Sequence, residues 1–390
     1  METSPTHSQP WYLNVMSGAQ RGPVAASLRA ALAVIEPFYS AAVGVRNRGF
    51  DRSGQARRLP RPVISVGNIT AGGTGKTPVV RWLAEHLRAR GRNVAILSRG
   101  YKAAPGSLGD EQRMLDRLLN QADAVEPSNA IHKGAAPFGP LRPVYLYADP
   151  DRHAAGERAI SEHPEIDVFL LDDGFQHRRL ARDFDLVLIR ATEPFGFGHV
   201  LPRGLLREPL SGLRRASAFV LTHADGIDTA EREQITRELR RHNPAAPVFA
   251  AIHSSVAIRC APPTGGADQE LPVERLFGVR AFAFCGIGNP NSFERELRSR
   301  CGTYIGHRWF ADHHAYSLAD MDAVRDAAQR GGAEVLVTTE KDWSKLVELP
   351  HPPGGLPIWR LDVTARFLDG DDHRLVERIE QTIARVHRPK

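Results

Sequence analysis

A glycine-rich segment followed by lysine and threonine is the part of the chain that most clearly suggests chemistry. The stretch GNITAGGTGKTP covers residues 67–78. Glycines let backbone amides turn around a phosphate, a lysine reaches terminal phosphate oxygens, and a threonine hydroxyl can ligate Mg²⁺. The strict phosphate-loop pattern needs glycine where this chain has Thr70, so a variant phosphate loop and a structural turn are both possible. The candidate cofactor-binding residues are Gly72, Gly73, Thr74, Gly75, Lys76 and Thr77.

The sequence on both sides of this segment favours the phosphate-loop interpretation. VISV at 63–66 is typical of a buried strand, and the residues from Val79 to Leu87 repeat apolar side chains at a four-residue spacing. A second strand-like run, VAIL, follows at 94–97. The order strand, loop, helix, strand is the one that aims a helix N-terminus at a bound phosphate.

Two adjacent carboxylates give the second strong signal. Asp172 and Asp173 follow the apolar run at 168–171, and ligands of open α/β sheets bind beyond the carboxyl ends of strands. In phosphate-loop enzymes a strand-end aspartate binds or orients Mg²⁺. Helix capping is the alternative role for one of them.

Three motifs hold candidates for proton transfer or phosphate binding. Asp110 in GDE could be a general base, although an aspartate before a helix is usually a cap. His313 in DHH lies beside Asp312, which could tune it for proton transfer; a surface or capping role is the alternative. Lys341 in TEKD could meet a phosphate or belong to a surface salt-bridge cluster.

A basic segment at 201–215 offers further phosphate ligands. Arg203 and Arg207 suit bidentate contacts with phosphate, and Glu208 follows them directly. A solvated basic loop would have the same composition. The segment is therefore a candidate substrate-binding site.

Composition narrows the class of protein. The 390 residues carry a net charge of +6, with 42% hydrophobic and 25% charged residues, as in a soluble globular protein. A basic balance suits a membrane surface, a phosphorylated substrate or nucleic acid. Aromatic residues are only 7%, and no nucleic-acid-binding signature occurs, so nucleic acid is disfavoured. The three cysteines have no metal-ligand spacing and fit a reducing compartment.

The N-terminal region predicts a helix at a membrane surface. It lacks the basic region of a secretory signal. Residues 24–50 are apolar over nearly the length of a membrane span, but Arg29, Glu36 and Pro37 interrupt them. We expect an amphipathic helix in the bilayer interface, with the arginines that follow facing anionic headgroups. A helix packed on the protein's own surface is the alternative.

Strand-like runs alternate with helical patterns along most of the chain, which predicts an α/β fold with a mainly parallel sheet. We expect a flexible N-terminus at 1–23 and the interfacial helix at 24–50. A phosphate-loop domain at 51–260, a linker or loop at 261–272 and a smaller α/β domain at 273–390 complete the prediction. The expected strands contain VISV, VAIL, PVYLY, DVFLL, DLVLI, AFVLT, PVFAAI, AFAFC, EVLVT and PIWRL.

Taken together, the motifs resemble those of one family, the tetraacyldisaccharide 4′-kinases. The resemblance covers residues 24–385 and rests on motifs that occur in the family's order. The variant loop is that family's own version, and the segment between SRGY and GDE is shorter than expected. The motifs are VGNITAGGTGKTP, LSRGY, GDE, LLDDGFQHRRLARD, LPRGLLREP, CGIGNP, DHHAYS and TEKD.

The resemblance implies a lipid kinase that uses ATP and Mg²⁺ to phosphorylate the 4′-hydroxyl of a tetraacyldisaccharide 1-phosphate. It implies work at the cytoplasmic face of the inner membrane, an active site between two domains, and no obligate protein partner. Asp110 would be the base toward the sugar hydroxyl and His313 its partner. Lys76 and Thr77 would serve the phosphate and Mg²⁺, and Asp172, Asp173 and Glu208 would serve the metal region. With Asp110 and His313 in different predicted domains, domain closure would assemble the base.

Two other classes of function remain open from sequence. A GTPase or metallochaperone switch would need a guanine-reading N-K-x-D element, and the stretches at 222–225 and 339–342 both lack the asparagine. A nucleotide-binding membrane adaptor without catalysis would not need the intact set of Lys76, Thr77, Asp172 and Asp110.

Overall fold

The computed structural model describes residues 11–54, 56–100, 108–121, 142–260, 269–288, 290–312, 314–346, 349 and 355–386. The chain divides into two compact units. Unit 1 comprises 1–108, 132–252 and 365–390, and unit 2 comprises 109–131 and 253–364. Strands β7 (Val248–Cys260) and β12 (Ile358–Phe367) each run from one unit into the other.

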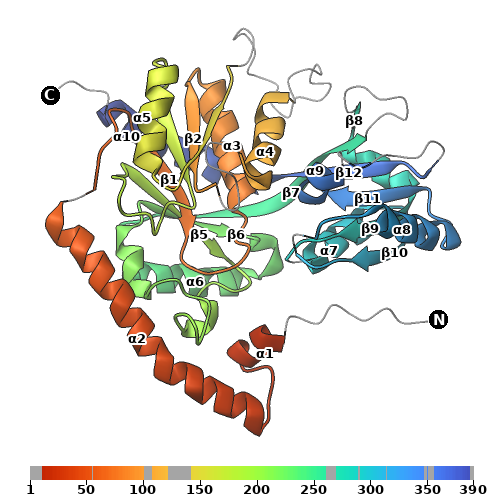
Figure 1. Ribbon diagram of the computed structural model, residues 1–390, viewed down its shortest axis with the longest axis horizontal. Coiled ribbons are helices and arrows are strands. Elements are labelled where there is room, and N and C mark those ends of the chain that lie inside the picture. Colours follow the sequence, from red (N-terminus) through yellow and green to blue (C-terminus); the bar gives the residue numbers. More distant parts are fainter. Residues whose placement is uncertain are drawn as a thin grey trace. The chain divides into compact units, whose positions relative to one another are not determined.

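Unit 1 is built on a parallel sheet whose strands are buried on both faces, which is why their sequences are continuous apolar runs. Its strand order is β6-β5-β1-β4-β2-β3, and the start of β7 pairs with β6. Each of these neighbouring pairs is parallel (Figure 1). The strands are β1 (Val63–Asn68), β2 (Val94–Ser98), β3 (Tyr145–Ala148), β4 (Val168–Asp172), β5 (Phe184–Arg190) and β6 (Ala218–Thr222).

Helices cover both faces of this sheet. One face packs against α5 (Arg152–Glu162) and α6 (Thr229–His242), through apolar clusters that include Ala155 and Ile235. The helix α3 (Lys76–Ala89) contacts β1, β2 and β4, and α10 (Asp371–Val386) contacts α3. An aspartate-led capping box, Asp228 with Glu231, begins α6.

Unit 2 repeats this layered plan on a smaller scale. Its parallel strands lie in the order β10-β9-β11-β12, and β8 pairs antiparallel with β7. One sheet face packs on α7, through Phe293 and Leu297, and the other on α8 and α9. The elements are α4 (Asp110–Asp116), β8 (Gln269–Leu271), β9 (Arg280–Cys285), α7 (Pro290–Arg300), β10 (Thr303–Trp309), α8 (Leu318–Arg330), β11 (Val335–Thr339) and α9 (Glu340–Leu346).

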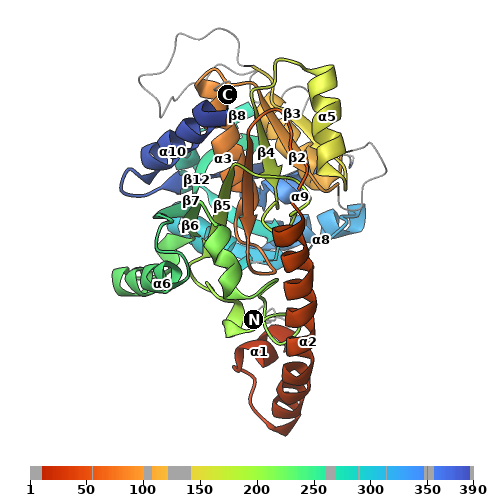
Figure 2. The ribbon, with the colours of Figure 1, turned by 90° about the vertical axis from the view of Figure 1, so that its left-hand side faces the viewer.

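The N-terminal part of unit 1 consists of α1 (Trp11–Ser17) and the long α2 (Pro23–Ser53), which lie side by side (Figure 2). A helix was expected at 24–50, and α2 covers these residues, whereas its place at a membrane interface stays a prediction. The flexible segment expected at 1–23 contains a helix, because Val15 is buried where α1 packs on α2. Residues 1–10 lie outside the described part.

The units differ from the predicted domains in four segments, of which the first is 253–260, the end of β7, in unit 2. Residues 109–131 belong to unit 2, since α4 packs against α9, and α10 belongs to unit 1, where Arg92 of the α3–β2 connection pairs with Glu380. The linker expected at 261–272 ends in β8; its residues 261–268 lie outside the described part. Asp110 therefore falls in unit 2, and His313 lies outside the described residues, so assembly of this pair by domain closure stays a prediction.

Candidate functional site

The loop between β1 and α3 has the backbone of an anion cradle. Gly72 and Gly75 have φ angles of 115° and 74°, a region that side-chain-bearing residues rarely adopt. Gly75 is also the residue that begins α3, and Lys76 and Thr77 form its first turn. The helix N-terminus with its partial positive charge therefore opens onto the loop, as phosphate binding requires.

Side chains at the ends of two neighbouring strands hold the carbonyl groups of this loop. Thr222, at the end of β6, donates from its hydroxyl to the Thr74 carbonyl oxygen over 2.9 Å. Arg190, at the end of β5, donates to the Gly73 carbonyl oxygen over 3.4 Å. Sequence reasoning missed both residues, although each ends a strand and so lies at the edge of the sheet where ligands bind.

The two aspartates lie at the end of β4, beside the phosphate loop. Asp172 pairs in register with Val66 of β1. Asp173 has φ 51° and accepts hydrogen bonds from Arg207 over 2.8 and 2.9 Å, and the Lys76 ammonium lies 3.6 Å from it. Burial raises the pKa of Asp173, but attraction to Lys76 and Arg207 outweighs burial and lowers it. The structure thus brings together Lys76, Asp173 and Arg207.

Positive charge dominates the surroundings of these aspartates. Arg152 is buried and interacts electrostatically with both Asp172 and Asp173. Burial and, second, repulsion by Arg152 lower the pKa of His177 to about 4, so this histidine is neutral at physiological pH. Fixed cations at a helix N-terminus favour binding of a polyanion.

Arg207 reaches Asp173 because its own segment pairs with the phosphate loop. The Arg207 amide donates to the Ile69 carbonyl over 2.8 Å, and the Ala71 amide donates to the Leu205 carbonyl over 2.7 Å. Thr70, the residue that departs from the strict motif, forms an antiparallel bridge with Leu206 and is buried. A residue with a Cβ is accommodated here because the chain is extended and paired.

Glu208 has a different environment from the metal role that the family resemblance suggested. Its side chain is 1% exposed and accepts hydrogen bonds from Arg215 over 2.8 and 2.9 Å. Gln176 and Asn47 donate to it over 3.0 and 3.2 Å. A carboxylate buried with these donors is neutralised by protein groups, so we leave it out of the metal site. Among the described residues, no group of three or more His, Cys, Asp and Glu side chains could hold a metal ion.

The remaining candidates lie elsewhere. Arg203 donates to the Met16 carbonyl over 2.9 Å and so holds α1. Lys341 pairs with Asp312 over 2.7 Å in unit 2. Asp110 is the first residue of α4, and nothing is described of its side chain. His313 lies outside the described residues.

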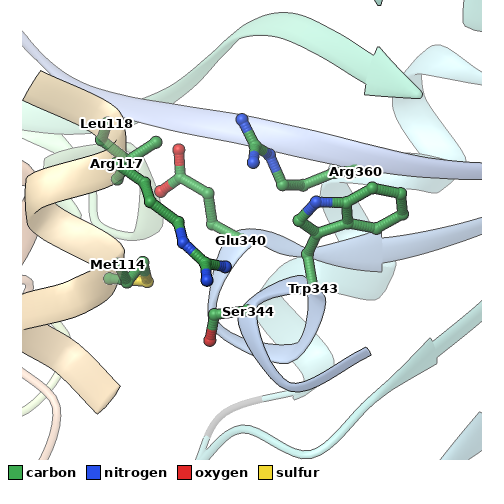
Figure 3. Close-up of a pocket in the computed structure, with 7 residues that line it drawn as sticks. All are labelled: Met114, Arg117, Leu118, Glu340, Trp343, Ser344 and Arg360. Atoms are coloured by element: carbon green, nitrogen blue, oxygen red, sulfur yellow. The ribbon is translucent and has the colours of Figure 1, made fainter. Parts of the chain in front are cut away.

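A small pocket in unit 2 shows how α4 is held. Side chains of α4 and of the π-helical turn that follows it (Arg117–Gln121) face α9 and β12 (Figure 3). Met114 and Leu118 are buried, as is Trp343 on the opposite side. The helix that begins at Asp110 is therefore fixed by packing against the TEKD motif. The pocket is lined by Met114, Arg117, Leu118, Glu340, Trp343, Ser344 and Arg360.

Comparisons with known proteins agree on one family. A sequence profile described as Tetraacyldisaccharide-1-P 4′-kinase matches residues 28–384. The chain is 36% identical over 363 residues to a tetraacyldisaccharide 4′-kinase of Geobacter sulfurreducens, covering 92% of this chain and 95% of that protein. It is 36% identical over 352 residues to that of Anaeromyxobacter dehalogenans, covering 90% of each.

A solved structure supports the same likeness. The crystal structure of the corresponding kinase from Aquifex aeolicus, in complex with ATP, superposes with a TM-score of 0.64 and 26% sequence identity. The match covers 93% of this chain and 100% of that one. The predicted fold class, a phosphate-loop sheet with a smaller α/β part, is confirmed by this neighbour.

Proposed function

The chain belongs to the tetraacyldisaccharide 4′-kinase family, and we propose how its residues transfer a phosphoryl group from ATP to the 4′-hydroxyl of an acylated disaccharide 1-phosphate. The observation that carries the proposal is the cluster of Lys76, Asp173 and Arg207 at the phosphate loop. It supplies two cations and one carboxylate at the N-terminus of α3, where the β- and γ-phosphates of ATP would bind.

Lys76 and the loop amides would hold the terminal phosphates. Lys76 is already drawn toward the site by Asp173, and on binding of ATP it would exchange this carboxylate for phosphate oxygens. Arg207 would remain on Asp173 or share a phosphate oxygen, because its guanidinium has several donors. Positioning and neutralisation of charge supply most of the catalysis in phosphoryl transfer.

Mg²⁺ fits the donor set at the same place. Thr77, Asp172 and Asp173 offer only oxygen ligands, which Mg²⁺ prefers, and one or two carboxylates plus substrate phosphates commonly suffice for it. Bound there, the ion would neutralise charge that develops on the transferred phosphoryl group. Asp172 ends β4 at the level of Val66, so its carboxylate belongs to the sheet edge that also carries the loop.

Asp110 would be the base that activates the acceptor hydroxyl, with His313 as its partner. A sugar hydroxyl is a poor nucleophile, and a positioned base is typically worth ~10²- to 10⁴-fold in rate. The packing of α4 on α9 supports this role, because a base must be held by a rigid element.

The lipid acceptor would be reached through α2. This helix is long and apolar enough to cross a membrane over Pro23–Asp51, and only 6% of its most apolar window is buried. Val34, Phe38 and Val45 are well exposed on it, as are Trp11 and Tyr12 on α1. We propose that this surface lies in the cytoplasmic interface of the inner membrane, near anionic headgroups.

The test is phosphate transfer from ATP to tetraacyldisaccharide 1-phosphate in mixed detergent micelles. Wild type should phosphorylate the lipid, and Asp110→Asn should lose ~10²-fold or more in kcat while still binding ATP. Asp116→Asn, in the last turn of the same helix, is the matched control and should keep wild-type kcat. Nucleotide binding by wild type without transfer to the lipid would refute the kinase proposal.

A further inference from the structure

The helix α2 has two chemically different faces. The outer face carries Val24, Val34, Ile35, Phe38 and Val45, each at least half exposed. The inner face carries polar side chains that bind the body of unit 1. Glu36, the acidic residue that interrupts the apolar sequence of this helix, lies on this inner face.

Glu36 is the centre of the inner face. Its carboxylate accepts a hydrogen bond from the Val200 amide over 2.8 Å and lies 3.0 Å from Nδ1 of His199. Only 19% of the side chain is exposed. A carboxylate in an apolar helix is costly unless it is bonded, and here both of its oxygens have partners in one loop.

Two more residues continue this face at helical spacing. The Tyr39 hydroxyl donates to the Arg207 carbonyl oxygen over 3.2 Å, and the Asn47 amide donates to Glu208 over 3.2 Å. Residues 36, 39, 43 and 47 share one side of a helix, and Val43 is buried there. The inner face of α2 thus contacts the segment His199–Glu208 at both of its ends.

The segment His199–Glu208 is also the one that pairs with the phosphate loop. Its backbone is bonded to Ile69 and Ala71, and Arg207 is the residue that holds Asp173 beside Lys76. Glu36 and Tyr39 are therefore separated from the phosphate loop by a single segment of chain. All of these contacts lie within unit 1.

We propose that Glu36 and Tyr39 are positioning residues of the nucleotide site. They hold the His199–Glu208 segment against the phosphate loop, so the helix that meets the lipid surface also sets the geometry of Lys76 and Arg207. The inference rests on the proposed function, since it takes Lys76 as the phosphate ligand. It predicts that ATP affinity depends on the inner face of α2 even when no lipid is present.

The test is calorimetric titration of the full-length protein with ATP and Mg²⁺ in detergent without lipid. Glu36→Leu should weaken ATP binding by ~10-fold, because it removes a charged acceptor from the segment. Glu36→Gln keeps an acceptor for the Val200 amide and should lose only ~3-fold. Tyr39→Phe removes a single neutral donor and should also lose ~3-fold.

Phe38→Ser is the matched control on the outer face of the same helix. It should keep the wild-type dissociation constant for ATP and instead reduce binding to vesicles that contain an anionic phospholipid. In the kinase assay, the Glu36 variants should raise KM for ATP with KM for the lipid unchanged, whereas Phe38→Ser should raise only KM for the lipid. Substitution of a residue that merely stabilised the fold would not raise KM for one substrate and leave KM for the other unchanged.

The outcomes separate the two proposals. Failure of wild type to bind ATP would refute the nucleotide site itself. If wild type binds ATP and the folded Glu36→Gln and Tyr39→Phe variants bind it with the same affinity, the positioning role is overturned and the nucleotide site is not. Should Glu36→Leu fail to fold, as judged by thermal unfolding, the two conservative variants decide.

Discussion

Two strand-end carboxylates, one in each unit, have opposite environments. Asp173 follows β4, its side chain is 39% exposed, and its partners are the flexible cations Lys76 and Arg207. Asp342 lies in α9 just after β11, and its side chain is fully buried. It accepts from the Gly286 amide over 3.1 Å and from the Thr339 hydroxyl over 2.7 Å.

This difference indicates which of the two carboxylates is accessible to a ligand. Cations around Asp173 can move to another anion, since water reaches the pair and the side chains are long. Asp342 accepts hydrogen bonds from a backbone amide and a neighbouring hydroxyl, and the Lys345 ammonium lies 3.8 Å from it. Asp342 also helps to raise the pKa of Tyr316, where burial is the first cause. We therefore propose Asp173 as part of a binding site, whereas Asp342 ties α9 to the residue that follows β9.

The largest expected effect comes from a substitution in the exposed cluster of Lys76, Asp173 and Arg207. Lys76→Ala should lower kcat/KM for ATP by ~10³-fold, because it removes a charge that faces the transferred phosphoryl group. Steady-state assays at varied ATP concentration measure this. Arg237→Ala, which breaks an exposed pair with Glu233 on α6, is the control and should have no effect. A loss of less than tenfold in Lys76→Ala would mean that this lysine does not bind the phosphates.

The next largest effect comes from a substitution of Asp342, which is buried with its donors Gly286 and Thr339. Asp342→Asn should lower the free energy of unfolding by ~2–3 kcal/mol, because a charged acceptor with fixed donors is replaced by a weaker one. ATP affinity should stay at the wild-type value. Denaturant unfolding and ATP titration check both, with Asp322→Asn on the exposed side of α8 as control. Loss of ATP affinity without loss of stability would contradict the distinction between the clusters.

The smallest expected effect is on how the free energy of unfolding changes in acid. Because the pKa of Asp173 is lowered in the folded state, its contribution is present above the unfolded value of about 3.9 and is lost as pH falls through the folded value. Arg207→Met should thus cost less than ~1 kcal/mol near pH 7, as for a partly exposed pair. The cost should decrease as the pH falls and Asp173 becomes protonated, as measured by unfolding at about pH 7 and about pH 2. A cost that is equal at both pH values would assign Arg207 to packing alone.

Much of the fold could be predicted because most neighbouring strands are parallel and most strands are buried on both faces. Apolar runs such as VISV and DVFLL are direct evidence of such strands, and each expected strand is present. β10 was missed because it is partly exposed and carries glycine, histidine and arginine in its sequence. β8 was missed because only three residues form it. The hydrophobicity pattern carries too little signal in these two strands, although it predicted β3, which also lies at an edge of the sheet.

The candidate site was predictable where chemistry depends on neighbours in sequence. Lys76 and Thr77 follow their glycines directly, and Asp173 follows its strand, so type and spacing sufficed to find them. Glu208 and Arg207 are adjacent and equally polar, yet one faces Arg215 in a buried network and the other reaches Asp173. Sequence could not separate them, because the partners come from distant segments.

The sequence by itself determined the phosphate loop, the parallel α/β plan and the apolar character of α2, because each follows from local residue types and their period. Tertiary structure decided which charged side chains are bonded to other groups of the protein. It placed α4 with unit 2, buried Glu208 and Asp342 among donors, and turned Glu36 inward to the segment that supports the phosphate loop. The physical reason is that the cost of a buried charge is set by partners that only folding brings within hydrogen-bonding distance.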